Sequence, residues 1–464
     1  MKITSNNSVE EVNIAYIGGG SRGWAWALMA DLALEPNMSG TIKLYDLNYE
    51  SAQKNEIIGN RLSSREDALG KWEYAAVKNI EDALRGADFV IISILPGGFE
   101  YSSVDVEEPE RYGVYQPVGD SVGPGGLIRS MRAIPMFEEI GMAIKKYCPN
   151  SWVINYTNPM SVCTGTLYRT FPEIKAYGCC HEVYGTQEIL MEMLEEMCGI
   201  RVESRKDIHI DVCGVNHFTW ITSAHYKNID LFPIYKEFIE KHTDGYVRKK
   251  DGNWMNDSFS CANLVKFDLF NRYHVIAAAG DRHLAEFLPP WYLKGDEEMK
   301  QWKFSRTPIE WRKNNRIRLL EKAERLAAGE EEVALVPTGE EGVLQMKAMA
   351  GVSTLISNVN VPNMGQMPNM KRGTVVETNA IFSGESVQPI LARELPPAVH
   401  SLVERQGEIQ DMVIEAGITR DRELAFQAFL NDPQLAGLRL NEAKDLFDSM
   451  IAKTSGLLPD EWKC

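Results

Sequence analysis

Basic side chains are scarce in this sequence. Its 464 residues include 49 Lys and Arg against 65 Asp and Glu, so the formal net charge is −16. The clearest basic clusters, Arg248-Lys249-Lys250 and Lys371-Arg372, are short. Because a chain of this charge repels phosphate polyanions, we expect no nucleic acid partner. An anionic small substrate would meet the same repulsion, so specific cations in its pocket would have to reverse it.

Long apolar runs are also absent. No window holds the ~20 uninterrupted apolar residues that a membrane-spanning helix requires, so we expect no membrane partner. Residues 1–12 are polar and acidic, unlike the apolar core of an export signal. The eight cysteines are scattered and form no C-x-x-C pair, which indicates reduced thiols and a cytoplasmic protein.

What is present is the composition of a folded protein, with 44% apolar and 25% charged residues. The length suggests two or three domains. In the first third, β-rich runs separated by helix-length segments lie at residues 12–17, 41–45, 89–95, 152–155 and 176–180. This alternation predicts an α/β fold with βαβ units and a doubly wound parallel sheet.

After about residue 200 the pattern changes. Residues 208–215 and 218–226 read as neighbouring antiparallel strands, and the chain beyond Pro233 reads as mostly helical. The longest helices are predicted over 304–326, 389–416 and 421–430. Residues 358–378 are rich in Asn, Pro, Gly and Met, which predicts a loop with an extended end at 374–377.

A glycine-rich motif follows the first predicted strand directly. Gly18, Gly20 and Gly23 satisfy G-x-G-x-x-G, with Ser21 and Arg22 between them, and a helix is expected over 23–34. Glycines let the backbone approach a pyrophosphate, and the helix N-terminus offers free N–H groups and a positive dipole. The motif favours dinucleotide binding; a tight turn without a ligand is the alternative.

Two further features complete this expected nucleotide site. Asp46 ends the second predicted strand and is placed to accept from ribose hydroxyls, which disfavours the 2′-phosphate of NADP. The segment 93–98, which contains Pro96, would form the second lip of the crevice. We therefore predict a Rossmann-like NAD-binding domain over residues 1–200 and an α+β substrate and catalytic domain, mostly helical, over residues 201–464.

Two more polar motifs lie in the first half. The glycine-rich loop 119–126 contains Asp120 and leads into a helix with Arg129 and Arg132, so it could lie flat against a ligand. Asn158 comes just after a predicted strand, and carboxyl ends of parallel strands are where doubly wound folds bind ligands. It could hold a sugar hydroxyl or the cofactor amide, or it could form an Asn-Pro turn without a ligand.

Cys180 and His217 are candidate metal ligands. Cys180 is followed by His181, Glu182 and Val183 after a predicted strand, and His217 ends Gly-Val-Asn-His. One thiolate and one imidazole would make an incomplete site with positions left for water or substrate. A buried thiol and a core histidine are the alternative.

A charged segment comes later in the chain. Asp281, Arg282, His283 and Glu286 lie within six residues, between Gly280 and Pro289. That is more charge than a solvated loop requires, so we include this segment in the candidate site.

These motifs, in this order, resemble glycoside hydrolase family 4, the NAD- and manganese-dependent glycosidases related in fold to lactate and malate dehydrogenases. The match runs from Gly18 through Cys180 and His217 to the segment 363–377 and covers most of the chain. Cys-His-Glu-Val looks like the signature of the family members that cleave α-D-galacturonides.

The resemblance implies a redox mechanism of elimination and addition. NAD⁺ would oxidise C3, Mn²⁺ would polarise the ketone, a base would remove the C2 proton, the aglycone would leave, water would add, and the ketone would be reduced. Cys180 and His217 would bind Mn²⁺. His181 would be the acid and Asp281 the base, with Tyr273 and Tyr292 as alternatives to Asp281.

Substrate binding is expected from residues near these positions. The candidates are Asp120, Arg129, Asn158, Arg282 and His283. Arginine offers a bidentate fork for a sugar carboxylate, so Arg129, Arg132, Arg282 and His283 are the cations that could attract an acidic sugar. The resemblance also implies a homodimer or homotetramer that acts on small glycosides of sugar acids.

Other functions stay open from the sequence. Within the family, the substrate could be an α-galactoside or an α-glucuronide. Outside it, the same fold could serve a 2-hydroxyacid dehydrogenase or an NAD(H)-binding redox sensor, although neither needs a thiolate and imidazole metal site.

Overall fold

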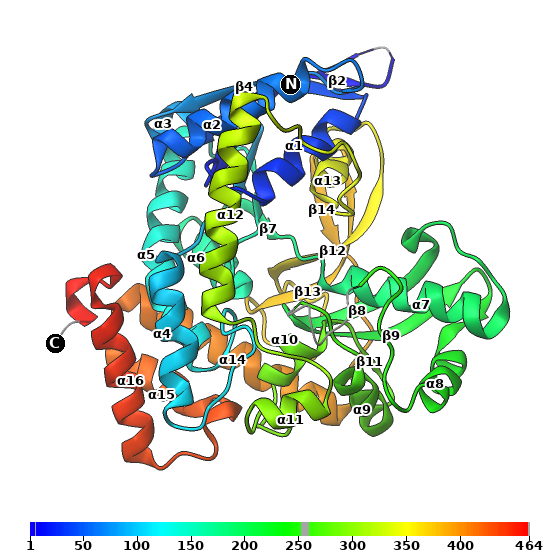
Figure 1. Ribbon diagram of the computed structural model, residues 1–464, viewed down its shortest axis with the longest axis vertical. Helices are drawn as coiled ribbons and strands as arrows, with labels where there is room; N and C mark the ends of the chain where they lie inside the picture. Colours follow the sequence, from blue (N-terminus) through cyan, green and yellow to red (C-terminus); the bar gives the residue numbers. More distant parts are fainter. Residues whose placement is uncertain (5, 252–258, 463–464) are drawn as a thin grey trace.

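The computed structural model describes residues 1–4, 6–251 and 259–462, and its N-terminal part is built on a parallel sheet (Figure 1). Six strands pair in the order β4-β3-β2-β5-β6-β7. They are β2 (Val9–Ile17), β3 (Met38–Tyr45), β4 (Trp72–Val77), β5 (Phe89–Ile92), β6 (Trp152–Asn155) and β7 (Lys175–Gly178). This is the strand order of a doubly wound nucleotide-binding fold, so the predicted fold class is confirmed.

Helices cover both faces of this sheet. All four residues of β5 are buried, as expected where both faces of a parallel strand are packed. The helices of this part are α1 (Trp24–Leu34), α2 (Tyr49–Ser63), α3 (Ile80–Leu84), α4 (Gly98–Glu110), α5 (Gly123–Tyr147), α6 (Met160–Thr170) and α7 (Glu182–Cys198).

The sheet does not end at β7. Asn360 of β12 pairs antiparallel with Gly178, and the sheet continues through β13, β8, β9 and β10. These strands are β12 (Leu355–Pro362), β13 (Val375–Ser383), β8 (Ile208–Val215), β9 (Phe218–Tyr226) and β10 (Ile229–Asp230), and three short strands pair at their sides: β1 (Lys2–Ile3), β11 (Ile276–Ala277) and β14 (Ser386–Pro389). One sheet of 14 strands therefore runs through both halves of the described chain.

The remaining helices surround the antiparallel strands or pack back onto the N-terminal half. They are α8 (Leu231–Lys241), α9 (Leu264–Tyr273), α10 (Asp281–Glu286), α11 (Asp296–Gln301), α12 (Ile309–Ala328), α13 (Gly342–Met349), α14 (Pro397–Thr419), α15 (Arg422–Asn431) and α16 (Leu440–Thr454). In one apolar cluster, Met131 of α5, Ile414 of α14 and Phe447 of α16 are all buried. The two halves therefore share a hydrophobic core as well as the sheet.

Three of the boundaries that we predicted are wrong. The loop expected over 358–378 begins as strand, because Val359 and Val361 are buried in the sheet and β12 extends to Pro362. The helix expected over 389–416 begins only at Pro397, since proline lacks the N–H that a helix interior needs. The helix expected over 304–326 likewise starts after Pro308.

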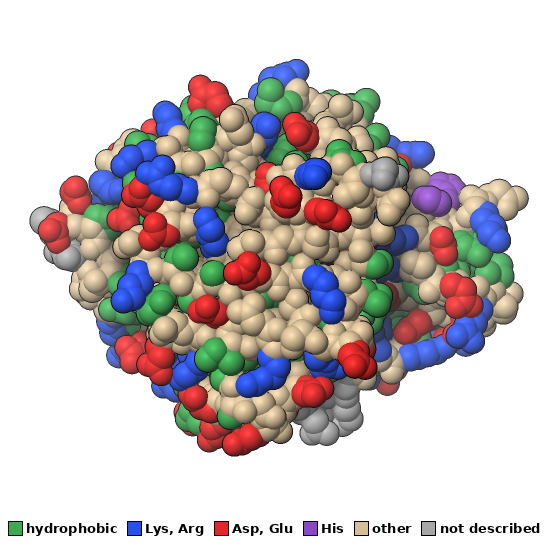
Figure 2. Space-filling model, turned by 90° about the horizontal axis from the view of Figure 1, so that it is seen from above, with side chains coloured by type: hydrophobic (Ala, Val, Ile, Leu, Met, Phe, Trp, Pro, Cys, Tyr) green, Lys and Arg blue, Asp and Glu red, His purple; other side chains and the backbone are tan. Residues whose placement is uncertain are grey.

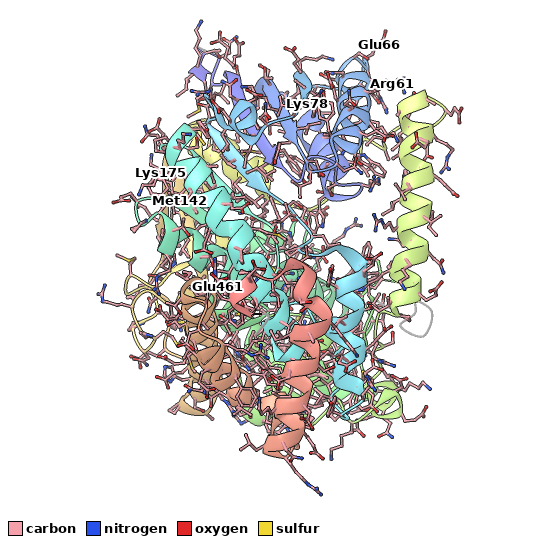
Figure 3. All side chains as sticks on the ribbon, turned by 90° about the vertical axis from the view of Figure 1, so that its left-hand side faces the viewer. Arg61, Glu66, Lys78, Met142, Lys175 and Glu461 are labelled. Atoms are coloured by element: carbon pink, nitrogen blue, oxygen red, sulfur yellow. The ribbon has the colours of Figure 1, made fainter. Side chains whose placement is uncertain are left out.

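The helix α12 lies along one side of the molecule, where it packs against α2 and α4 (Figure 3). Arg61 of α2 donates to the Leu326 carbonyl near the C-terminal end of α12 (2.6 Å). Helix α12 therefore runs from α2 to α4, where Arg312 donates to the Val118 carbonyl in the loop that contains Asp120.

Charge is mixed on the surface. Figure 2 shows acidic and basic side chains interspersed on the face that it presents. The cluster Arg248-Lys249-Lys250 is paired, because each of its side chains reaches Glu188 or Glu195 of α7. Within the described residues, every helix is too short or too polar to cross a membrane.

Candidate active site

The glycine turn lies between β2 and α1, as the motif predicts. Gly18 has φ +90°, and a Cβ there would lie 2.0 Å from the Ser93 carbonyl oxygen, so only glycine fits. The N–H groups of Gly18 and Gly19 both donate to the Tyr45 carbonyl (2.9 Å each). Gly23 precedes α1 without a side-chain cap, so the first N–H groups of the helix stay available.

Asp46 lies beside this turn at the end of β3. Its Oδ2 accepts from the Gly20 N–H (2.9 Å) and its Oδ1 from the Asn48 N–H (2.8 Å). Ser21 bonds back to the Gly18 carbonyl, and Arg22 donates to Ser51. Pro96 lies in the turn before α4, so the structure brings every predicted nucleotide-site residue to the carboxyl ends of β2, β3 and β5.

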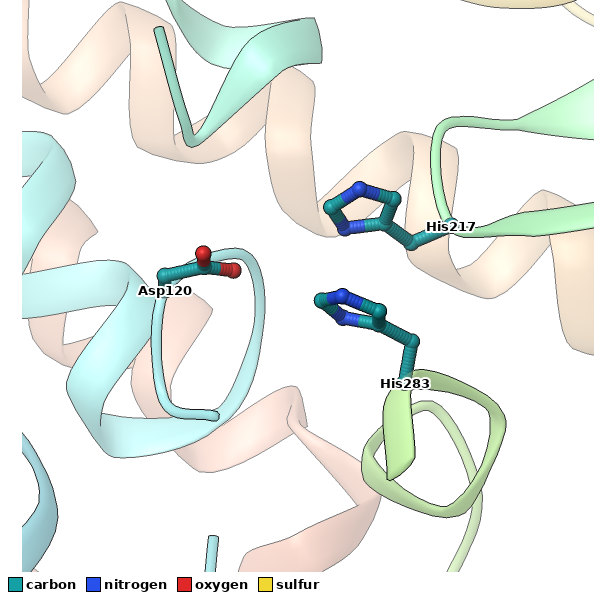
Figure 4. Close-up of side chains that lie close together, drawn as sticks. All are labelled: Asp120, His217 and His283. Atoms are coloured by element: carbon teal, nitrogen blue, oxygen red, sulfur yellow. The ribbon is translucent and has the colours of Figure 1, made fainter. Parts of the chain in front are cut away.

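Asp120, His217 and His283 form a compact cluster (Figure 4). One ligand atom from each lies within 4.8 Å of the other two. The two imidazole rings stack with centroids 3.8 Å apart. The cluster draws on the loop before α5, the turn between β8 and β9, and α10. It is the one group of three such ligands found among the described residues.

Local structure explains why His217 points there. Val215 pairs with Phe218, so Asn216 and His217 form a two-residue hairpin turn, and His217 takes φ +65°. Its Nδ1 bonds Ser121 Oγ (2.9 Å), which donates to Asp120 (2.8 Å). Burial lowers the pKa of His217 to about 3, and the charge of His283 acts in the same direction. His217 is therefore neutral, as a metal ligand must be.

Glu286 braces the loop that carries Asp120. Its carboxylate accepts from the Val118 N–H (2.6 Å) and the Gly119 N–H (3.0 Å). Burial raises its pKa to about 8. This contact links α10 to the loop and keeps Asp120 opposite His283.

Cys180 is buried just before α7 but is not a member of the three-residue cluster. Burial raises the pKa of its thiol, and the charges of Glu377 and Glu182 raise it further. A cation beside it would offset these effects, because a thiol that coordinates a metal loses its proton.

Three polar residues near Cys180 were not predicted from the sequence as site residues: Asn216, Glu377 and Glu182. The Glu377 carboxylate accepts from Asn358 (2.6 Å) and from Thr219, and Asn358 also donates to the Cys180 carbonyl (3.1 Å). Both polar side-chain atoms of Asn216 are buried without a hydrogen-bond partner in the described chain. The sequence signal was weak: polar residues in runs that otherwise read as strand or loop.

Glu182 and His181 begin the same segment. Glu182 accepts from the Gly280 N–H (2.8 Å) and lies 3.8 Å from His283 Nε2. His181 Nδ1 lies 3.1 Å from Glu340, and the His181 side chain is 48% exposed. Its ring also packs near Trp24, the first residue of α1 (centroids 5.8 Å). His181 is therefore accessible. It follows Cys180 in the chain and lies near Trp24, which comes directly after the glycine turn.

Asp281 is held at the N-terminus of α9. Its two oxygens accept from the Val265 N–H (3.2 Å) and the Lys266 N–H (3.1 Å). Burial raises its pKa to about 6, against the charge of Lys266. Of the alternative bases, Tyr292 donates to Asp268 (2.6 Å) and Tyr273 packs edge-on against Trp220.

The predicted substrate-binding residues meet around Asp120. Asn158 Nδ2 donates to Asp120 (3.2 Å), and Arg129 Nε donates to the Asn158 carbonyl (3.0 Å). Arg282 donates to the Pro117 carbonyl (3.1 Å). Arg132 differs, because its guanidinium forms two hydrogen bonds with buried Asp105 on α4 (3.0 and 2.6 Å).

Comparison with protein families identifies the family of the chain. The family 4 glycosyl hydrolase model matches residues 13–196, and the model of the C-terminal domain of that family matches residues 212–435. The chain belongs to glycosyl hydrolase family 4. The predicted family is confirmed, and the protein is a glycosidase.

Individual relatives agree with the family match. An α-galacturonidase of Thermoanaerobacterium saccharolyticum is 55% identical over 461 residues, 99% of each chain. The crystal structure of the protein LplD from Bacillus subtilis is 51% identical in sequence to this chain, with a TM-score of 0.91. The match covers 95% of this chain and 100% of that one. A 6-phospho-α-glucosidase from gut microorganisms, solved with NAD and Mn²⁺, shares the fold at 20% identity, with a TM-score of 0.77 over 97% and 99% of the two chains.

Proposed function

We propose that this family 4 glycosyl hydrolase is an α-galacturonidase that uses NAD⁺ and a divalent metal, Mn²⁺ first. The observation that carries the substrate is the 55% identity to a named α-galacturonidase over 99% of both chains. The site is compatible with an acidic sugar, because Arg129 and Arg282 lie beside the loop that contains Asp120.

The residues present fit the metal. A carboxylate and two imidazoles are donors that Mn²⁺ accepts, and His283 Nδ1 is buried without a hydrogen-bond partner in the described chain. His217 and Cys180 would hold the ion, as the family resemblance implies, and the geometry adds Asp120 and His283 as further donors.

The dinucleotide would lie on the glycine turn. Gly18, Gly20, Ser21, Arg22 and Gly23 would face the pyrophosphate, Asp46 would face the ribose, and Pro96 would line the opposite lip. When bound, NAD⁺ and Mn²⁺ would supply a hydride acceptor and a Lewis acid.

The chain itself would move the protons. His181 donates a proton to the oxygen of the leaving group; Glu340 orients its ring, and its exposure lets it reach a bound glycoside. Asp281 takes the proton from C2, and a pKa of about 6 suits a base at neutral pH. Asn158 and Arg129 support Asp120 and so fix the sugar against the cluster.

The decisive experiment combines product analysis with metal removal. Purified protein with NAD⁺, Mn²⁺ and a reductant should release galacturonic acid from α-galacturonides in D₂O, with deuterium at C2 of the product. Adding a chelator should stop turnover, and excess Mn²⁺ should restore it. Cleavage of the neutral α-galactoside but not the uronide would remove the substrate assignment, and hydrolysis that survives chelation would remove the metal.

Three further expectations, on location, assembly and domain division, belong to the same proposal. The protein works in the cytoplasm, assembles as a homodimer or homotetramer, and divides into the domains 1–200 and 201–464. Light scattering coupled to size-exclusion chromatography tests the assembly directly, and a monomer at working concentration would contradict it.

A further inference from the structure

The buried arginines differ in whether an acid neutralises them. Arg129, Arg132 and Arg282 are 6%, 0% and 8% exposed. Arg132 is paired with Asp105. Among the described residues, neither Arg129 nor Arg282 has a carboxylate within ion-pair distance. A buried cation without an anion is costly, so these two positions call for an anionic ligand.

Arg312 adds a third guanidinium at the same place. It lies in the first turn of α12, is partly buried, and donates to the Val118 carbonyl (3.4 Å). Arg282 donates to the preceding carbonyl, Pro117 (3.1 Å), and to Thr307. The two guanidinium groups thus dock on consecutive carbonyls just before Asp120, and Arg312 too lacks an ion-pair partner among the described residues.

The nearby acids do not neutralise this pair. Asp120 accepts from Ser121 and Asn158 and faces the two histidines. Glu286 accepts two backbone N–H groups and, among the described residues, forms no ion pair with either arginine, while Asp105 is paired with Arg132. Arg282 Nε is buried without a hydrogen-bond partner in the described chain, and the guanidinium lies over the Phe259 ring (5.3 Å to its centroid). The loop that contains Asp120 therefore carries a local excess of positive charge inside a molecule of net charge −16.

We propose that Arg312 and Arg282 together form the subsite that binds the carboxylate of the sugar acid. A planar guanidinium offers two parallel N–H donors to a carboxylate, which an ammonium cannot match. A neutral galactoside would leave both cations unpaired, so the subsite selects uronides by penalising the neutral sugar as well as by attracting the acid. The inference rests on the proposed function for the identity of the ligand.

The test uses the full-length protein loaded with NAD⁺ and Mn²⁺. Arg312→Gln removes the charge, and Arg312→Lys keeps the charge without the two parallel N–H donors. The control Arg318→Gln removes an exposed arginine that bonds Asn315 on the same helix. We measure competitive inhibition or direct binding of D-galacturonate and of D-galactose, together with kcat/KM on 4-nitrophenyl α-D-galacturonide and α-D-galactoside. Thermal unfolding and NAD⁺ affinity show that each variant is folded.

Arg312→Gln should weaken galacturonate binding by about 10- to 100-fold, the range for a lost hydrogen bond to a charged group, and galactose binding by less than about threefold. Arg312→Lys should lie between, and Arg318→Gln should match the wild type. Unchanged selectivity in Arg312→Gln, with the wild type active on uronides, overturns the subsite and leaves the function standing. Wild type that binds galacturonate through Arg312 but does not cleave the uronide overturns the function alone. Wild type that neither binds nor cleaves the acid overturns both.

Discussion

At the scale of single residues, the cluster Asp120–His217–His283 decides what chemistry the site can support. It places one carboxylate and two imidazoles within 4.8 Å of one another. Because burial keeps His217 neutral, its imidazole can offer a lone pair, and the cluster places three possible ligand atoms close together. A divalent cation is the ligand that such a set favours.

His217→Ala should therefore weaken Mn²⁺ binding by at least about 100-fold, since even residues that only orient a metal ligand contribute 10- to 100-fold. Isothermal titration of the apoprotein with Mn²⁺ measures the change. The matched control is His225→Ala on β9, where the ring bonds Ser223; this substitution should leave the Mn²⁺ affinity unchanged. Retained Mn²⁺ affinity in both His217→Ala and Cys180→Ala would contradict the ligand assignment.

Glu286 gives a prediction about pH. Its pKa is raised to about 8 by burial, so the folded state holds its proton between pH 5 and 8 more tightly than the unfolded chain does. Its contribution to stability is full below its unfolded pKa of about 4.5 and is lost as pH rises through 8. The wild type should lose thermal stability between pH 6 and pH 9.

Glu286→Gln keeps an acceptor for the Val118 and Gly119 N–H groups and cannot ionise. Its Tm should fall less over the same pH range, and calorimetry of both proteins at pH 6 and pH 9 measures the difference. Parallel falls in the two proteins would show that Glu286 does not carry this pH dependence.

At the scale of elements, one buried ion pair joins α5 to α4 within the N-terminal half. Arg132 of α5 and Asp105 of α4 are 0% and 1% exposed and form two hydrogen bonds. Arg129 lies one turn earlier on the same helix and supports Asn158 instead. Arg132 therefore stabilises the packing of α5 against α4, whereas Arg129 supports a residue of the candidate site.

Arg132→Ala should lower the free energy of unfolding by ~3–5 kcal/mol, because it removes the hydrogen-bonded partner of buried Asp105. Urea denaturation measures the loss. Arg111→Ala is the control: Arg111 is 67% exposed, and Glu108 keeps Lys453 and Ser449 as partners, so the loss should be only ~0–1 kcal/mol. Equal losses in the free energy of unfolding would show that the buried pair stabilises the fold no more than the pair of Arg111 does.

At the scale of the whole molecule, the sheet and the helical core join the two halves. Asn360 pairs with Gly178 across the junction, and α14 packs on α5 and α6. Neither half can open without exposing a strand edge and a buried helix face. This arrangement favours cooperative unfolding of the whole chain.

Urea unfolding at equilibrium should accordingly give one transition, with the same midpoint by far-ultraviolet circular dichroism and by tryptophan fluorescence. The ten tryptophans report on both halves. Two resolved transitions would contradict this expectation and would indicate that the predicted domains unfold independently.

The sequence alone was sufficient for the fold class, because strand and helix periodicity and the turn at Gly18 are local properties of the chain. The family and the glycosidase activity followed from the resemblance of its motifs, in their order, to a known family. The predicted roles of Cys180, His181 and Asp281 stay predictions. Strand β12 was missed because its Asn358 and Asn360 are polar, and only the partners Cys180, Glu377 and Met160 make them acceptable in a buried strand.

What only the tertiary structure decided is which residues meet. Ser121 and His217 are 96 residues apart, and packing alone brings them to 2.9 Å. Arg129, Arg132 and Arg282 are equivalent cations in the sequence, but within the described chain a buried carboxylate neutralises Arg132 alone of the three. Charge pairing depends on distances of a few ångströms between elements remote in the chain, so the pattern of residues could name the candidates for an acidic sugar but not choose among them.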